Sequence, residues 1–329
     1  MPESRERWRS FDEEIREWGP QGSRNACSLA EAESYCRKLA TGHYENFPLV
    51  SLLLPKKLHQ PFFNVYAFCR WSDDLGDEIN NPVRSLQLLQ WWREQMVLCH
   101  QVASGQELSG EISLTHPVMI ALQKTIQEFE IPLQPFVDLI SAFEQDQCQT
   151  RYETFEDLLN YCERSANPVG RLVLYLGRDV SEQNFIWSDA ICTGLQLANF
   201  WQDVARDYQI GRIYLPVAEM KEFGVSEETI RERVSTEAFQ KLMTFQVERT
   251  RLFFEKGKPL VNHVTNDLRL DVDLFVRGGE CILDKITRID YRVLETRPKV
   301  TKWDGGRLLI MALGRSFLNR LFRRDFKSG

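Results

Sequence analysis

The sequence lacks the features that mark secreted, membrane-spanning and nucleic-acid-binding proteins. Its eight cysteines include no Cys-x-x-Cys pair and no metal-ligand spacing, so we expect free thiols in a reducing, cytoplasmic compartment. The charged N-terminus has no apolar core of the kind found in signal peptides. No apolar run approaches the roughly 18 residues that a spanning helix requires. The net charge of −6 argues against a nucleic-acid partner.

Several cofactor and catalytic motifs are also missing. No Gly-x-Gly-x-x-Gly segment and no Gly-x-x-x-x-Gly-Lys-Ser/Thr segment occurs, so the chain shows no nucleotide-binding fingerprint. The five histidines form no His-x-x-x-His pair, which argues against a zinc site on a helix. No Gly-x-Ser-x-Gly segment indicates a serine hydrolase.

Strand signals are scarce, whereas helical patterns are common. No Asn-Gly or Asp-Gly pair joins two alternating runs, so no hairpin is predicted. We interpret the prolines, Pro61 among them, as boundaries between helices. Gly278 and Gly279 predict a close-packing point or a kink in the last helix. The sequence therefore predicts an all-α fold. Its helices are expected near residues 83–103, 115–129, 134–147, 154–163, 167–178, 186–207, 238–257 and 267–295.

The ends of the chain differ from its middle. No repeat or low-complexity linker divides the sequence, which favours one domain over residues 26–299, preceded by a flexible arm over 1–25. Residues 300–329 carry seven Lys or Arg and two Asp, a net charge of +5. Within them, "RLLIMALGRSFLNRLFRR" (307–324) has the pattern of a basic amphipathic helix that lies on a membrane surface. The alternative is a terminal helix that belongs to the same domain and exposes a basic edge.

The segment "YAFCRWSDDLGDE" (66–78) places four acids within six residues. On a helix, Asp73 and Asp77 share one face, and Asp74 and Glu78 form a second pair beside them. Like charges at this spacing destabilise a helix. A hard cation such as Mg²⁺, which prefers carboxylate oxygens, would offset that repulsion. The alternative is a solvated helix end.

A second acidic segment, "QLANFWQDVARDY" (196–208), places Asn199, Asp203 and Asp207 in one stripe along a helix. Apolar neighbours predict that this helix is buried, where carboxylates need partners. Two such stripes on apolar helices could face each other across shared metal ions, and those ions could neutralise a diphosphate beside a pocket for a hydrocarbon.

An arginine accompanies each stripe. Arg70 precedes Asp73 by three residues, and Arg212 follows Asp207 by five. Guanidinium groups suit bidentate contacts with phosphate. The alternative for both is an ion pair with the neighbouring aspartates.

These two segments resemble the aspartate-rich motifs of the squalene and phytoene synthase family, in the same order and with matching separation. The resemblance extends from about residue 43 to residue 295. It implies a single-domain isoprenoid-synthase fold, all-α and of the prenyltransferase type, around a central cavity. It also implies Mg²⁺-dependent, head-to-head chemistry on isoprenoid diphosphates, with the C₃₀ or C₄₀ product built from two prenyl chains.

The resemblance assigns roles by position. It implies that the metal is bound, and catalysis supported, by Asp73, Asp77, Asn199, Asp203 and Asp207. It implies diphosphate contacts from Tyr66, Arg70 and Arg212, and a place in the cavity for Gln196. It also implies that Tyr161 and Phe47 stabilise a cation through their π faces. The alternative for Tyr161 is a core tyrosine with a satisfied hydroxyl.

The stretches "ENFP…SLLLP" and "YCERSANPVGR" are similar to the bacterial hydroxysqualene synthases of the hopanoid pathway. This similarity implies conversion of presqualene diphosphate and water to hydroxysqualene and diphosphate, alongside other enzymes of that pathway. An insoluble product implies peripheral contact with the inner face of the membrane. NADPH is not expected, because these enzymes capture water and not hydride.

The family pattern is not followed everywhere. The Ser-Phe segment of many members is replaced by "HYENFPLVSLLLP" (43–55), and the arginine that often precedes the first aspartate of the second motif is Gln202. The missing arginine puts in doubt a full two-step reaction from farnesyl diphosphate. Three other products therefore stay open, namely presqualene diphosphate, squalene made with NADPH, and phytoene. A non-catalytic assembly factor is a further alternative, although the intact acids argue against it.

Overall fold

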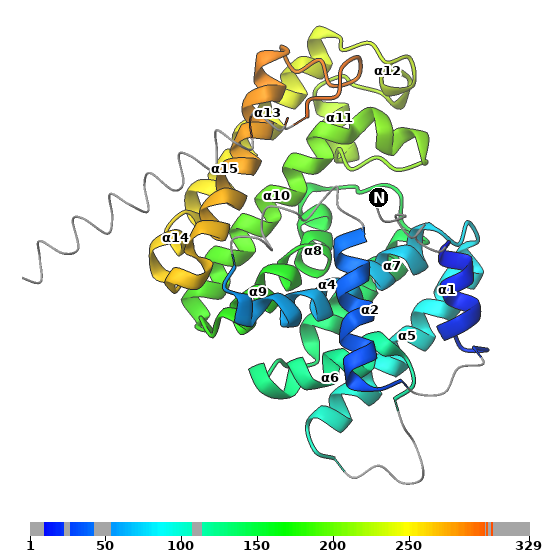
Figure 1. The fold of residues 1–329 in the computed structure, drawn as a ribbon. Helices are drawn as coiled ribbons and strands as arrows, with labels where there is room; N and C mark the ends of the chain where they lie inside the picture. The colour runs from blue at the N-terminus through cyan, green and yellow to red at the C-terminus, as the bar shows by residue number, and fades with distance from the viewer. Residues whose placement is uncertain are drawn as a thin grey trace, which may run out of the picture. The chain divides into compact units, whose positions relative to one another are not determined.

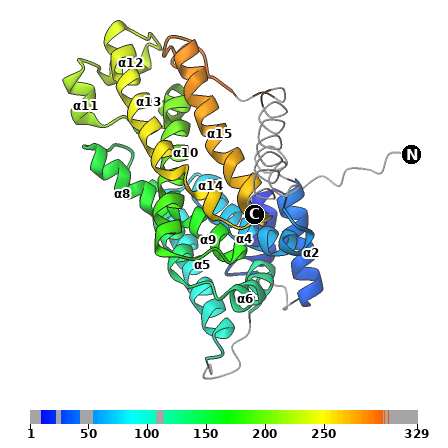
Figure 2. The same cartoon turned by 90° about the vertical axis from the view of Figure 1, so that its left-hand side faces the viewer.

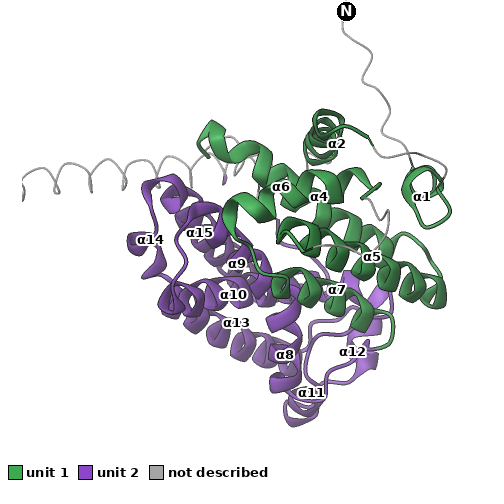
Figure 3. Cartoon of the chain, turned by 90° about the horizontal axis from the view of Figure 1, so that it is seen from below, with its two compact units in different colours: residues 1–148 green, residues 149–329 purple. Residues whose placement is uncertain are grey.

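The computed structural model describes residues 10–22, 27–42, 54–106, 114–299, 301 and 304. These residues form helices, turns and loops, and none of them lies in a strand. The predicted all-α class is therefore confirmed. Contacts within the chain separate two units, residues 1–148 and 149–329, within the span that the sequence assigned to one domain (Figure 3). Phe47 and the basic segment 307–324 lie outside the described residues.

Unit 1 is built around α4 (Lys56–Asp77), which packs against most of the other helices of this unit (Figure 1). The others are α1 (Phe11–Trp18), α2 (Leu29–Gly42), α5 (Pro82–Ala103), α6 (Pro117–Phe129) and α7 (Gln134–Asp146). Pro61 lies inside α4, where the sequence predicted a boundary. Pro61 is the sixth residue of the helix, so its missing N–H removes one backbone hydrogen bond of the second turn, and the helix continues through it. Asn80 ends the helical region with a φ of 52°.

Helix α1 lies within the segment for which the sequence predicted a flexible arm. It starts after Ser10, whose backbone N–H donates to Glu13 Oε2 at 3.0 Å. Its Phe11 ring meets Trp71 of α4 edge-on, with centroids 5.0 Å apart. The Tyr35 hydroxyl donates to Glu14 Oε2 at 2.7 Å and accepts from Trp71 Nε1 at 2.8 Å. One hydroxyl thus joins α1 and α2 to the helix that carries the first acidic motif.

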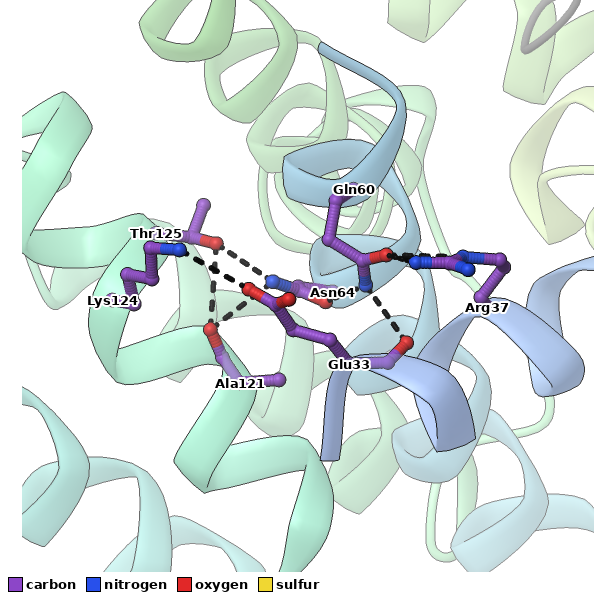
Figure 4. Close-up of polar contacts among 7 residues, drawn as sticks. All are labelled: Glu33, Arg37, Gln60, Asn64, Ala121, Lys124 and Thr125. Atoms are coloured by element: carbon purple, nitrogen blue, oxygen red, sulfur yellow. Dashed lines mark hydrogen bonds and ion pairs between the residues drawn. The ribbon is translucent and has the colours of Figure 1, made fainter. Parts of the chain in front are cut away.

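Side-chain amides join α2, α4 and α6 (Figure 4). The buried Asn64 donates to the Ala121 carbonyl at 3.1 Å and to Thr125 Oγ1 at 3.0 Å, and its own Oδ1 accepts from Gln60 at 2.8 Å. Gln60 also donates to the Glu33 carbonyl at 2.9 Å. Because every polar atom of Asn64 is paired, its burial carries little desolvation penalty, and the contacts fix α4 against its neighbours.

Unit 2 is built around α10 (Glu182–Gln209), which packs against α9, α13 and α15 (Figure 2). Ser181 caps its start by accepting the Asn184 N–H at 3.1 Å, and Gly211, at a φ of +84°, follows its end. The helices of this unit are α8 (Phe155–Ser165), α9 (Asn167–Gly177), α10, α11 (Val217–Glu222), α12 (Glu227–Arg231), α13 (Glu237–Gly257), α14 (Leu260–His263) and α15 (Asn266–Arg288).

The close-packing point predicted at the paired glycines is confirmed for Gly279 alone. A Cβ there would lie 2.2 Å from Cζ of Phe254 in α13 and 3.0 Å from Cδ2 of Leu195 in α10. At Gly278 a Cβ would meet no atom within 4 Å. α15 runs through both glycines as one continuous helix.

The predicted end of α15 at residue 295 is wrong, because the helix stops at Arg288. Asp290 and Tyr291 follow with φ values of 52° and 58°, in the left-handed region that a right-handed helix cannot accommodate. Residues 289–299 then form an irregular segment, which we call the strap. The other predicted helices end within four residues of their observed bounds. None of the helices in the described residues is long and apolar enough to cross a membrane.

Candidate active site

The first acidic motif occupies the last two turns of α4, and Arg70 divides its aspartates into two kinds. The Arg70 guanidinium pairs with both carboxylate oxygens of Asp74, and its Nε lies 3.0 Å from Oδ2. Its contact with Asp73 is longer, at 3.4 Å. The Asp74 side chain is 8% exposed and that of Asp73 is 42% exposed. Asp74 therefore anchors the arginine, whereas Asp73 is the more exposed of the two acids and Asp77, one turn further on, is exposed as well.

The electrostatics of this motif show a shortage of positive charge. Burial raises the pKa of Asp73 to about 6, and repulsion from Asp77 adds to the shift. Burial also raises the pKa of Asp74 to about 6, against the opposing effect of its hydrogen bonds from Arg70. One turn earlier, burial raises the pKa of Tyr66, and the nearby Arg70 offsets part of that shift. One guanidinium is not enough for these acids, so a cation would bind here favourably.

The second motif lies along α10, and its three predicted ligands differ in exposure. Asp203 is 5% exposed, Asp207 is partly buried and Asn199 is exposed. The sequence predicted that the whole stripe is buried. The structure shows that the stripe follows the edge of the buried face, so that only its middle member is enclosed.

Burial raises the pKa of Asp207 to about 7, and Asp203 adds repulsion, whereas Arg212 lowers it. The Arg212 backbone N–H also donates to the Asp207 carbonyl at 2.8 Å, in the turn that follows α10. The predicted proximity of this arginine to the stripe is thus observed. Its role toward diphosphate remains a prediction.

Asp203 has a partner that the sequence did not suggest. The Arg297 guanidinium of the strap contacts both carboxylate oxygens, with Nη2 2.8 Å from Oδ2. Next to it, Gln202 Nε2 donates to the Pro298 carbonyl at 2.6 Å. The sequence predicted a continuous helix up to residue 295, so a return of the following residues to α10 was not expected. Pro298 disfavours helix only at Arg297, which the predicted helix already excluded, so no sequence signal marks the reversal at Asp290 and Tyr291 that makes these contacts possible.

Two further predicted residues lie in the same unit. Tyr161 is 4% exposed and belongs to an aromatic cluster with ring centroids 5.5 Å from Tyr152, 6.0 Å from Tyr214 and 6.2 Å from Phe200. This environment fits both a core tyrosine and an aromatic wall beside a cation. Gln196 is partly buried, three residues before Asn199 on α10.

The donors of both motifs suit a hard divalent cation. They are carboxylate and amide oxygens, and the pKa values of Asp73 and Asp207 are raised chiefly by burial and further by a neighbouring carboxylate. Among the described residues, no three His, Cys, Asp or Glu side chains are grouped to hold a metal by themselves. Each helix spaces its acids one turn apart, and an arginine holds one acid of each motif. The residues fit a cation that takes few protein ligands and completes its shell with water or phosphate.

Comparison with known proteins identifies the class. Residues 40–304 match the squalene/phytoene synthase family, and the chain belongs to this family. Its members are head-to-head isoprenoid synthases that typically depend on a divalent metal and bind isoprenoid diphosphates.

Individual relatives are named as squalene, dehydrosqualene or phytoene synthases. Among solved structures, the squalene synthase HpnC from Alicyclobacillus acidocaldarius is 38% identical, with a TM-score of 0.73 and coverage of 80% of this chain and 95% of that one. A dehydrosqualene synthase in complex with ligand is 25% identical, with a TM-score of 0.75 and coverage of 89% and 98%. The 15-cis-phytoene synthase of Synechococcus elongatus is 29% identical over 293 residues, which cover 85% of this chain and 92% of the relative.

Proposed function

We propose that this protein is a hydroxysqualene synthase, which converts presqualene diphosphate and water to hydroxysqualene and diphosphate with Mg²⁺. The observation that carries the proposal is a pair of acidic motifs, each with undercompensated carboxylates and a guanidinium group, in a chain of the squalene/phytoene synthase family. The 38% identity to a squalene synthase, compared with 29% to a phytoene synthase, favours a C₃₀ product.

The residues of the chain would act first on the diphosphate. Asp73, Asp77, Asn199, Asp203 and Asp207 would hold Mg²⁺. The bound metal would neutralise the departing diphosphate. Arg70 is oriented by Asp74 before substrate arrives, so its remaining N–H groups can bind phosphate oxygens with little loss of side-chain freedom. Tyr66, near Asp73 and Asp74, and Arg212, near Asp207, would add hydrogen bonds.

The remaining steps occur on the hydrocarbon. When the carbon–oxygen bond to diphosphate breaks, its electron pair leaves with the diphosphate and a cyclopropylcarbinyl cation remains. Tyr161, in its aromatic cluster, and Phe47 would stabilise that cation by their π faces, and Gln196 would line the cavity nearby. After rearrangement, the oxygen of a water molecule bonds to the carbon and one proton is released. No reductant enters this balance, so NADPH is not required.

A second candidate is another head-to-head synthase, which would make presqualene diphosphate, squalene or phytoene. The named phytoene synthase and dehydrosqualene synthase relatives support it. For either reaction we propose a cytoplasmic enzyme that touches the inner face of the membrane through residues 300–329. That contact would pass the hydrophobic product to the next enzyme of a hopanoid-type pathway.

Product analysis tests the choice. The protein is incubated with presqualene diphosphate and Mg²⁺, with and without NADPH, and the products are identified by mass spectrometry. An alcohol formed without NADPH supports the proposal. A hydrocarbon that requires NADPH, or product only from farnesyl or geranylgeranyl diphosphate, would replace it with the second candidate.

Variants test the site itself. Asp73→Ala and Asp203→Ala are expected to abolish turnover while leaving the far-ultraviolet circular dichroism of a helical protein. Glu248→Ala, an exposed acid of α13, serves as the control and should keep full activity. Turnover by both aspartate variants would refute the metal assignment. If the wild-type protein forms no product from any of the diphosphates, a non-catalytic assembly factor is favoured.

A further inference from the structure

The strap holds the second acidic motif by several contacts. Arg297 makes two contacts with Asp203, and the Pro298 carbonyl accepts from Gln202. On its other side, Glu295 accepts from the backbone N–H of Ser235 at 2.9 Å and from its hydroxyl at 2.5 Å. The side chains of Val293 and Leu294 are 2% and 3% exposed. The strap is therefore docked on unit 2 and not simply collapsed onto one acid.

The charge that neutralises Asp203 comes from the strap. Position 202, directly before the aspartate, carries an uncharged glutamine, whose amide binds the backbone of the strap. Arg297 lies 94 residues further along the chain than Asp203. Its guanidinium contacts both carboxylate oxygens, which are the atoms that a metal ion would bind. The guanidinium is 36% exposed whereas the carboxylate is 7% exposed, so solvent reaches the arginine more readily than the acid.

We propose that Arg297 is a resident counter-ion of the second motif, which a divalent cation must displace from Asp203. Arg297 is thus a positioning residue, and the inference rests on the proposed metal-binding role of Asp203. When the cation binds, the bidentate pair opens and the strap loses one of its side-chain tethers. Metal binding to α10 is therefore coupled to release of residues 295–299.

The coupling makes the metal affinity of the free protein lower than its carboxylates alone would give. Removing the competitor should tighten metal binding, because the cation no longer has to break a charge-assisted pair. We expect an increase in affinity of about tenfold, which corresponds to about 1.4 kcal/mol.

The test measures Mn²⁺ binding to the full-length protein by electron paramagnetic resonance, without substrate. Arg297→Gln should bind Mn²⁺ about tenfold more tightly than the wild type. Arg171→Gln is the matched control, since Arg171 makes a similar bidentate pair with Asp189 of α10, outside the motif. Its Mn²⁺ affinity should equal that of the wild type. Hydrogen exchange should show faster deuterium uptake at residues 291–299 when Mn²⁺ is added to the wild type.

The outcomes separate this inference from the function on which it rests. If Asp203→Asn loses Mn²⁺ binding and Arg297→Gln binds no more tightly than the wild type, the counter-ion inference fails and the metal site stands. If the wild type and Asp203→Asn bind Mn²⁺ equally, the metal assignment and the inference both fail. If Arg297→Gln loses helical circular dichroism, Arg297→Lys is measured in its place. Lysine keeps the charge but cannot form the bidentate pair, so Mn²⁺ should bind more tightly than in the wild type, and unchanged affinity would overturn the inference.

Discussion

Replacement by alanine is expected to have opposite effects on the stability of the protein at Gly278 and at Gly279, two neighbouring residues of α15. A Cβ at Gly279 would lie 2.2 Å and 2.7 Å from two ring carbons of Phe254, well inside any van der Waals contact. The ring has little room to move, because it is fully buried and the same two carbons lie 3.1 Å from the point where a Cβ on Gly194 of α10 would stand. Gly279→Ala must therefore push α15 away from α10 and α13.

The magnitude follows from two opposing terms. Overpacking of a filled core costs about 1–3 kcal/mol. Replacing glycine by alanine within a helix contributes about 0.5–1 kcal/mol in the other direction. Gly279→Ala should therefore destabilise the protein by about 1–2 kcal/mol. Gly278→Ala receives the helix term alone, because no atom of the described residues obstructs its Cβ, and should stabilise by about 0.5–1 kcal/mol.

Urea denaturation followed by circular dichroism measures both variants against the wild type. The expected midpoints fall on either side of the wild-type value. Equal stability of the two variants, or a stabilising Gly279→Ala, would refute the packing argument. The displacement should also reach the strap, which begins one residue after α15 ends, so Gly279→Ala is expected to expose residues 291–299 to proteolysis.

Three other perturbations give further expected outcomes. Asn64→Ala should destabilise the protein by about 2–3 kcal/mol in urea, because it leaves buried partners unpaired, whereas Arg37→Ala, at an exposed contact to Gln60, should change stability by less than about 0.5 kcal/mol. Asp271 is 1% exposed, neither of its carboxylate oxygens has a hydrogen-bond partner among the described residues, and burial raises its pKa to about 7. A raised pKa in the folded state gives stability that is complete below pH 3.8 and is lost as the pH rises through about 7. This group should thus remove about 1.4 kcal/mol between about pH 6 and pH 8, and a urea midpoint of Asp271→Leu that falls as steeply as the wild type would contradict this. Deletion of residues 307–329 should abolish binding to anionic liposomes in a flotation assay, and unchanged binding would remove the membrane role of that segment.

Much of the helical framework could be predicted because it depends on local pattern. The 3.6-residue periodicity and the N-terminal prolines located α5, α7 and α9 closely, since Pro82, Pro135 and Pro168 stand in the first turn of each helix. Proline position misled at Pro61, which lies in the second turn of α4 and does not mark a helix boundary. α1 and α2 were not predicted, because α1 depends on contacts with Tyr35 and Trp71 that are distant in sequence.

In the candidate site, too, local features could be predicted from the sequence and contacts between side chains could not. Spacing along a helix was enough to place Asp73 with Asp77, and Asn199 with Asp203 and Asp207. It could not show which acid an arginine already holds, because the preference of Arg70 for Asp74 over Asp73 follows from side-chain reach. The contact between Arg297 and Asp203 could not be predicted from the sequence for a different reason. The approach of the arginine to Asp203 depends on left-handed backbone at Asp290 and Tyr291, two non-glycine residues that carry no sequence signal for this conformation.

The long reach of the strap has a consequence for the order of folding. Its contacts join residues 94, 96 and 60 positions apart, whereas the helix caps of unit 2 join residues three apart. Contacts between distant residues require loop closure and form after local structure in most small domains. The helix that carries Asp203 is therefore expected to form before Arg297 reaches it, so that the second acidic motif receives its counter-charge late in folding.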